Sequence, residues 1–202
     1  MIAIVDYDVG NLKNVYTALK DVELDGIITR DKKILDDADA IILPGVGAFS
    51  DAMNKLSEFD LVESLNENVK KGKLLLGICL GMQLLFDKSY EDGEFNGLSY
   101  IPGEIVRFPE SQLKIPHMGW NNLIKNVESP LLNQISEDDY VYFVHSYYAS
   151  PLDFNDVIAY ADYGVKVPGI VQRNNVIGMQ FHPEKSARVG KQLLSNLKEM
   201  IK

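Results

Sequence analysis

The sequence has few of the features that mark secreted or nucleic-acid-binding proteins. Only one of its 202 residues is cysteine, so no disulfide can form within the chain, and a lone thiol suits a reducing compartment. The formal net charge of −9 means that the chain repels polyphosphate backbones rather than attracting them. We therefore expect a cytoplasmic protein without a nucleic-acid partner.

Long apolar runs are also missing. The first residues carry no basic segment and are interrupted by Asp6 and Asp8, so no signal peptide is expected. The longest apolar stretch, residues 74–86, contains Gly77, Gly81 and Gln83, and it is shorter than the roughly 20 residues that a membrane helix needs. With 46% hydrophobic residues the chain can still bury a substantial core, and we expect one compact domain over residues 1–202.

Short apolar segments alternate with helical patterns in the first half of the chain. The patterns predict strands at residues 2–5, 25–29, 39–43 and 73–78, and helices at 12–19, 50–69 and 80–86. Right-handed crossovers between such strands place helices on both faces of a sheet. The fold class expected is therefore α/β, with a doubly wound, mostly parallel central sheet.

The second half changes to closely spaced strand patterns, which predict additional mixed or antiparallel strands. These lie at residues 103–108, 139–145, 157–161, 169–172 and 176–181. Apolar residues at helical spacing over 187–201 then predict a closing helix that packs on the sheet.

The single cysteine, Cys79, lies between a predicted buried strand and a predicted helix, with Gly77 and Gly81 on either side. This pattern is typical of a nucleophile elbow, a tight turn that holds a reactive side chain at the carboxyl end of a strand. The helix N-terminus would favour the thiolate, and the Leu80 amide would point toward an oxyanion. The alternative is that Cys79 is a small buried apolar residue.

A base and an orienting carboxylate are expected at His182 and Glu184. In an extended segment residues i and i+2 share a side, so the carboxylate can hold one imidazole nitrogen while the other accepts the thiol proton. Cys79, His182 and Glu184 then form a candidate triad, although a turn with a solvated carboxylate has the same sequence. His117 and His145 are rival bases, but neither has a carboxylate two residues away.

Residues 43–49 end another predicted strand at the same edge of the sheet. They include Gly45 and Gly47, so Val46 or Gly47 could donate a backbone amide to a developing oxyanion. The alternative is an ordinary loop between a strand and a helix. Gln83, one helical turn beyond Cys79, is a candidate contact for a substrate amino or carboxylate group. The alternative is a capping residue or a side chain that contacts solvent.

Three motifs in this order, Pro44-Gly45-Val46-Gly47, Gly77-Ile78-Cys79-Leu80-Gly81-Met82-Gln83 and His182-Pro183-Glu184, resemble the class I glutamine amidotransferases. The stretches 6–12, 116–121 and 182–186 make the chain most similar to the glutaminase subunits of imidazole glycerol phosphate synthases. The resemblance covers nearly the whole chain. It implies a flavodoxin-like glutaminase fold. It also implies a reaction that needs no metal or organic cofactor.

The resemblance also implies further site residues. Gly47 and Gln83 would contact glutamine together with the backbone around Ser146 and Tyr147. Asn11, Trp120 and Lys185 would face a partner subunit, although Trp120 could be a core residue and Lys185 a solvated charge.

The expected activity is hydrolysis of glutamine, with ammonia passed to a cyclase subunit built as a (β/α)8 barrel, in a heterodimer. The barrel would form imidazole glycerol phosphate and an aminoimidazole carboxamide ribotide in histidine biosynthesis. Two alternatives remain open: a glutaminase serving another synthase, of the anthranilate or pyridoxal phosphate type, and a catalytically silent regulatory subunit.

Overall fold

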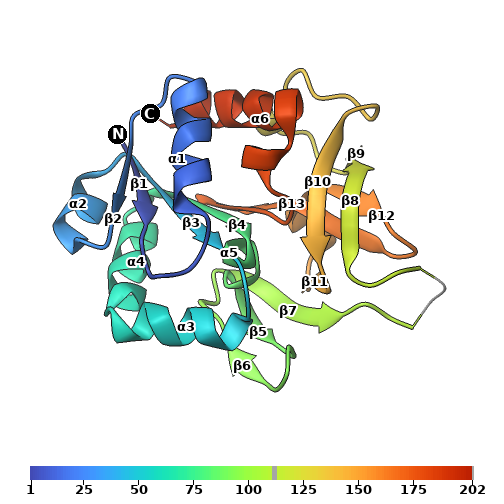
Figure 1. Cartoon of the computed structure of the whole chain (residues 1–202), viewed down its shortest axis with the longest axis horizontal. Helices are drawn as coiled ribbons and strands as arrows, with labels where there is room; N and C mark the ends of the chain where they lie inside the picture. Colours follow the sequence, from blue (N-terminus) through green and yellow to red (C-terminus); the bar gives the residue numbers. More distant parts are fainter. Residues whose placement is uncertain (111–112, 202) are drawn as a thin grey trace.

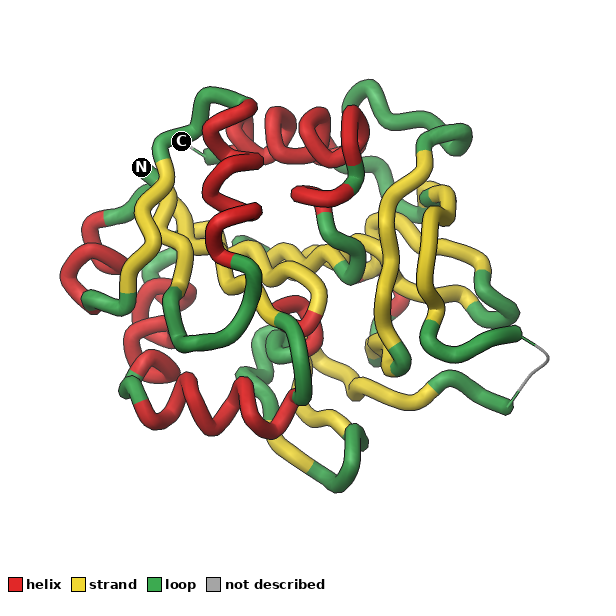
Figure 2. The backbone as a smooth tube through the Cα atoms, in the orientation of Figure 1, coloured by secondary structure: helices red, strands yellow, loops and turns green. Residues whose placement is uncertain are grey.

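An eight-stranded sheet crosses the molecule, with helices on both of its faces (Figures 1 and 2). The computed structural model describes residues 1–110 and 113–201. The strand order is β2-β1-β3-β4-β14-β13-β12-β9. The bounds are β1 Ile2–Val5, β2 Gly26–Thr29, β3 Ala40–Gly45, β4 Leu74–Cys79, β9 Ile124–Lys125, β12 Val157–Asp162, β13 Lys166–Arg173 and β14 Val176–Met179.

The first five strands in this order are parallel, and β13, β12 and β9 continue the sheet in antiparallel pairing. The chain winds outward from β1 in both directions, so the carboxyl ends of β1, β3 and β4 form a switch point of the type that binds ligands. The register brings the Cα of Gly45, at the end of β3, opposite that of Cys79, at the end of β4. The predicted mostly parallel, doubly wound sheet with added antiparallel strands is confirmed.

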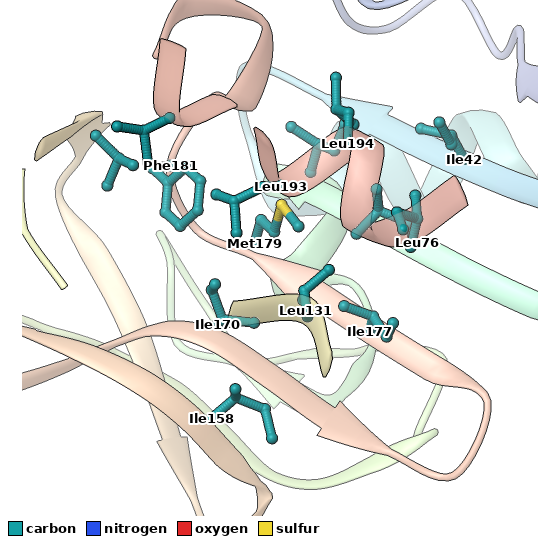
Figure 3. Close-up of a cluster of buried hydrophobic side chains, with 14 of the residues drawn as sticks. Ile42, Leu76, Leu131, Ile158, Ile170, Ile177, Met179, Phe181, Leu193 and Leu194 are labelled. Atoms are coloured by element: carbon teal, nitrogen blue, oxygen red, sulfur yellow. The ribbon is translucent and has the colours of Figure 1, made fainter. Parts of the chain in front are cut away.

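Two hydrophobic clusters cover the two faces of this sheet. Helices α1 and α6 contribute Val15, Leu19, Leu193 and Leu197 to one cluster. Figure 3 shows part of this cluster, including Leu193 and Met179. Helices α2, α3 and α4 contribute apolar side chains to the other cluster. The helix bounds are α1 Leu12–Asp21, α2 Lys32–Asp37, α3 Phe49–Glu58, α4 Leu61–Lys70, α5 Leu80–Gln83 and α6 Ala187–Met200.

Two smaller sheets flank the antiparallel end. One has the order β11-β7-β5-β6 and the other pairs β10 with β8. Their bounds are β5 Phe86–Ser89, β6 Phe95–Asn96, β7 Ile101–Arg107, β8 His117–Asn122, β10 Tyr140–His145 and β11 Tyr147–Pro151. The described residues also form the 3₁₀ turns η1 Pro130–Leu132, η2 Phe154–Asp156 and η3 Pro183–Lys185.

The predicted single helix over residues 50–69 is wrong. The chain forms α3 and α4, separated by Asp60 in the left-handed conformation with φ of 53°. Leu56 and Leu61 are both fully buried but five positions apart, a spacing that one continuous helix would place on different faces. A break resets the register so that both helices bury their apolar sides.

The predicted helix over residues 80–86 is also too long, because α5 stops at Gln83 and β5 begins at Phe86. The carbonyls of Leu84 and Leu85 accept hydrogen bonds from the amides of Leu98 and Tyr100 instead of continuing the helix. The returning chain therefore ends α5 after one turn. No helix among residues 1–110 and 113–201 is long and apolar enough to cross a membrane.

Helix α5 lies unusually close to β3, and Gly81 permits this approach. A Cβ atom at Gly81 would lie 1.8 Å from the Leu43 carbonyl oxygen, far inside van der Waals contact. Because α5 follows Cys79 directly, this contact sets the position of the turn that carries the cysteine.

We predict that Gly81→Ala lowers the free energy of unfolding by about 3 kcal/mol or more, since β3 or α5 must move to admit the methyl group. Gly47→Ala is the matched control. Its Cβ would meet no atom within 4 Å, so only its φ of +95° is penalised, at about 1–2 kcal/mol. Urea unfolding measures both variants, and equal losses would contradict the close packing.

Candidate active site

Cys79 lies at the turn between β4 and α5, in a backbone conformation that residues with a side chain rarely adopt. Its φ is 55° and its ψ −113°. The strand before it is buried, and Cys79 itself is only 7% exposed. Such a strained position persists only where surrounding packing enforces it, and it commonly marks a functional residue. The geometry is that of the predicted elbow.

His182 and Glu184 face each other beside Cys79. The His182 Nδ1 and Glu184 Oε1 atoms are 2.7 Å apart, and the two side chains are 4% and 3% exposed. The predicted strand reached Phe181, but β14 ends at Met179 and Glu184 lies in the 3₁₀ turn η3. Pro183 starts this turn, where its missing amide proton is not needed. The carboxylate fixes Nδ1 as the protonated nitrogen and leaves Nε2 for the thiol.

The surroundings of His182 favour its charged form. Burial alone would lower its pKa, but hydrogen bonding to Cys79 and to Glu184, with the charges of both groups, raises it to about 9. At neutral pH His182 is therefore a positively charged imidazolium with a proton on both nitrogens. An acid that protonates a leaving group needs this second proton. The contact with Cys79 also pairs this proton with the sulfur.

The segment after β3 lies next to Cys79 at the edge of the sheet. Val46 is 45% exposed, and Gly47 has a positive φ with open space around its α-carbon. The strand end before it is held, because the buried Tyr7 hydroxyl donates a hydrogen bond of 2.5 Å to the Pro44 carbonyl. The hydrogen bond therefore fixes the end of β3 directly before the Val46 and Gly47 peptides.

These segments surround a cavity of about 340 Å³. Its lining includes the predicted residues Val46, Gly47, Cys79, Leu80, Gln83, Ser146, Tyr147 and His182. The side chain of Gln83 is buried and donates hydrogen bonds through Nε2 to the Tyr147 carbonyl at 3.0 Å and to Gln180 Oε1 at 3.1 Å. Gln83 is therefore neither a cap nor solvated, because its amide is fixed within the site.

Glu91, Pro116, Val144 and His145 also line the cavity. The sequence indicates His145 only as a rival base, and it gives no signal for Glu91. Glu91 Oε2 accepts a hydrogen bond of 2.7 Å from the Phe49 amide, and burial raises the pKa of the Glu91 carboxyl despite that bond. Glu91 lies in a polar turn after β5, where nothing in the sequence distinguishes it from a solvated carboxylate.

The rival bases His117 and His145 are bonded to each other, with Nδ1 of His117 3.0 Å from Nε2 of His145. Burial lowers the pKa of His117 to about 4 and that of His145 to about 3. Both rings are thus neutral near pH 7, and neither contacts a carboxylate as His182 does. Among the described residues, no group of three or more His, Cys, Asp or Glu side chains could hold a metal ion.

The three residues predicted to face a partner lie outside this cavity. Asn11 is exposed and caps α1 through a hydrogen bond from the Asn14 amide. Lys185 is exposed in η3. Trp120 is 54% exposed on β8, so it is not the core residue that a lone tryptophan often is. Its exposed ring meets the Tyr142 ring edge-on, with centroids 6.0 Å apart.

We predict that Glu184→Gln lowers the pKa of His182 from about 9 to about 8 or below, because the variant loses a neighbouring negative charge. The folded-state pKa lies above the ordinary 6.5, so protonated His182 stabilises the fold at low pH, and this contribution disappears as the pH rises toward 9. NMR titration of the His182 ring measures the pKa directly. An unchanged midpoint would show that Glu184 does not hold the imidazolium.

Known proteins similar to this chain share its full length. It is 51% identical over 201 residues to the imidazole glycerol phosphate synthase subunit HisH of Carboxydothermus hydrogenoformans, covering 100% of both chains. It is 47% identical to the protein of the same name from Caldanaerobacter subterraneus subsp. tengcongensis, covering 100% of this chain and 99% of that protein.

The fold agrees with these similarities. A solved glutamine amidotransferase structure superposes with a TM-score of 0.77 at 19% identity, covering 100% of this chain and 99% of the other. The sequence model of the family described as glutamine amidotransferase class-I matches residues 3–200. The chain belongs to the class I glutamine amidotransferase family.

Proposed function

We propose that this chain is the glutaminase subunit of an imidazole glycerol phosphate synthase and hydrolyses glutamine to glutamate and ammonia. The observation that carries this proposal is the strained Cys79 turn beside the buried His182 and Glu184 pair, in a cavity large enough for an amino acid. The sequence identity of 47–51% to subunits named HisH, over the full length of this chain, supports the choice of synthase. We also propose one domain over residues 1–202 and, from the lone cysteine, a cytoplasmic location.

In the proposed reaction the Cys79 thiolate attacks the side-chain carbonyl of glutamine. The amides of Leu80 and of Val46 or Gly47 stabilise the oxyanion, where losing one such donor typically costs about 2.7–4 kcal/mol of barrier. His182 gives its proton to the departing ammonia and then accepts one from the water that hydrolyses the thioester. Glutamate leaves and the thiolate is restored, with Glu184 orienting the imidazole throughout. Every step uses side chains and backbone amides of this chain together with water.

The amino-acid end of glutamine would lie against Gln83, Glu91 and the backbone of Ser146 and Tyr147. Glu91 offers a carboxylate inside the cavity, and such a group suits the α-ammonium of glutamine. The cost of burying Glu91, which raises the pKa of its carboxyl, falls when the ammonium pairs with it.

We further propose that the outer face of β8 and β10 binds a cyclase subunit, built as a (β/α)8 barrel, to form a heterodimer. Met118, Trp120, Tyr140 and Tyr142 share this face, and the first three are more than half exposed. The Tyr142 carbonyl accepts a hydrogen bond from the His182 amide, and its own amide donates to Ser186 Oγ. The face therefore lies directly behind the turn that carries His182, Glu184 and Lys185.

Contacts between elements support Asn11 and Lys185 as the continuation of the same interface, since α1 contacts η3 and η3 contacts β10. Ammonia released at Cys79 would then be produced beside the bound barrel, where a sealed path can receive it.

Cys79→Ala tests the function. In the assembled synthase we expect glutamine-dependent formation of imidazole glycerol phosphate to disappear, because no thioester can form, while synthesis from added ammonia continues at the wild-type rate. The assay follows product formation with each nitrogen source. Loss of both activities would assign Cys79 a structural role, and glutamine-dependent synthesis that survives would refute the proposed nucleophile.

Trp120→Ala tests the partner face. Truncation of an exposed aromatic residue at the centre of an interface typically costs about 2 kcal/mol, so affinity for the cyclase subunit should fall roughly thirtyfold. Leu152→Ala is the matched control, because Leu152 is 79% exposed and lies after β11. Calorimetric titration measures both variants. Equal affinities for the two would place the interface elsewhere.

A further inference from the structure

Two buried histidines, one of which lines the cavity, take no part in the proposed chemistry. His117 on β8 and His145 at the end of β10 are register partners, and they are 3% and 7% exposed. The His117 ring stacks between Tyr163 and Phe143, with centroids 4.0 and 4.6 Å away. Because burial lowers the pKa of both rings, each carries a single proton near pH 7.

The two ends of the pair fix which nitrogen of each ring holds that proton. His145 Nδ1 lies 2.8 Å from the Tyr147 carbonyl, which can only accept, so Nδ1 of His145 is protonated and Nε2 is bare. The bare Nε2 then accepts from His117 Nδ1 at 3.0 Å. The proton of His117 is therefore on Nδ1 as well, and its Nε2 is bare.

Asn121 supplies the outer end of this chain. Its Nδ2 lies 3.3 Å from His117 Nε2 and donates to the Asp162 carbonyl at 3.0 Å, while its Oδ1 accepts from the Asn122 amide. These contacts agree on the orientation of the amide, so Nδ2 donates to the bare nitrogen of His117. Along the path from Asn121 through His117 and His145 to the Tyr147 carbonyl, each donor points toward the cavity.

The inner end reaches the proposed glutamine site through the Tyr147 carbonyl. This oxygen accepts from His145 Nδ1 and also from Gln83 Nε2 at 3.0 Å. The second amide proton of Gln83 goes to Gln180 Oε1. With both protons engaged, Gln83 offers only its Oε1 atom to a ligand in the cavity that it lines.

We propose that His145 and His117 are positioning residues for glutamine recognition. They hold the Tyr147 carbonyl where it fixes the Gln83 amide, so that the site presents a hydrogen-bond acceptor to the α-ammonium of glutamine. Without this support the amide of Gln83 can rotate and present its NH₂ group instead, which repels an ammonium. The inference rests on the proposed glutaminase function, because it assigns a role in recognising that substrate.

The protonation pattern is tested without any activity measurement. ¹⁵N NMR of the histidine side chains in the wild-type chain should show a proton on Nδ1, and none on Nε2, for both His117 and His145 at neutral pH. In Asn121→Ala the His117 Nε2 loses its donor, and the signals of both rings should shift. A proton on Nε2 of either ring in the wild type would overturn the inference.

Substrate selection tests the role itself. The probe is 4-carbamoylbutanoate, which is glutamine without its α-amino group, and the reading is the ratio of kcat/KM for glutamine to kcat/KM for this analogue in the assembled synthase. His145→Ala should reduce the ratio about tenfold or more, the size expected for losing a hydrogen bond to a charged group. His145→Asn can still donate to the Tyr147 carbonyl and should keep most of the wild-type ratio.

Asn126→Ala is the matched control, because Asn126 also donates to two backbone carbonyls, those of Phe154 and Val157, but lies outside the cavity lining. It should leave the ratio unchanged. If His145→Ala does not fold, Asn121→Ala is read in its place and should lower the ratio. A variant that slows both substrates equally would overturn the inference, whereas a wild-type synthase that hydrolyses no glutamine would refute the proposed function instead.

Discussion

The structure depends on the close packing of backbone around Cys79. Strand β3, strand β4 and helix α5 approach one another so closely that a single methyl group at Gly81 would collide with the Leu43 carbonyl. This packing holds Cys79 at a φ of 55°. Adopting that conformation costs a residue with a side chain about 1–2 kcal/mol, so an isolated chain would avoid it. The parallel pairing of β3 with β4 puts the end of β3 opposite the cysteine. A candidate nucleophile and a candidate oxyanion segment therefore come from one packing arrangement.

Around this centre the three histidines of the chain show how environment determines role. His182 is buried with a carboxylate and a thiol, and these partners raise its pKa. His117 and His145 are bonded to each other, and their other partners are the Asn121 side-chain amide and the Tyr147 carbonyl. Burial lowers the pKa of both rings. One environment suits a residue that moves protons, and the other suits a fixed hydrogen-bond pattern. The candidate site thus combines a reactive half with a rigid half.

The sequence predicted those parts of the molecule whose physical cause is local. Alternating apolar strands and helical patterns indicated the doubly wound sheet, and the glycines around Cys79 indicated the turn. Spacing of two residues placed His182 and Glu184 together, although a 3₁₀ turn rather than a strand brings them into contact. The break between α3 and α4 was readable in principle, because Leu56 and Leu61 do not share a face of one helix.

Other features could not be predicted because they depend on long-range pairing. The early end of α5 arises because the amides of residues 98 and 100 bond to the carbonyls of residues 84 and 85. Strands β5, β8 and β11 form because they pair with strands elsewhere in the chain. Glu91 and Gln180 belong to the site only because folding brings them to Phe49 and Gln83. No pattern near either residue indicates such a contact.

The central claim is that Cys79 forms a covalent γ-glutamyl intermediate. The most direct measurement is mass spectrometry of the assembled synthase, quenched with acid during turnover of glutamine and digested to locate the modified peptide. We expect a glutamyl group, glutamine minus ammonia, on the peptide that contains Cys79. Glutamine hydrolysis at full rate with that peptide unmodified, or with the adduct on another residue, would contradict it.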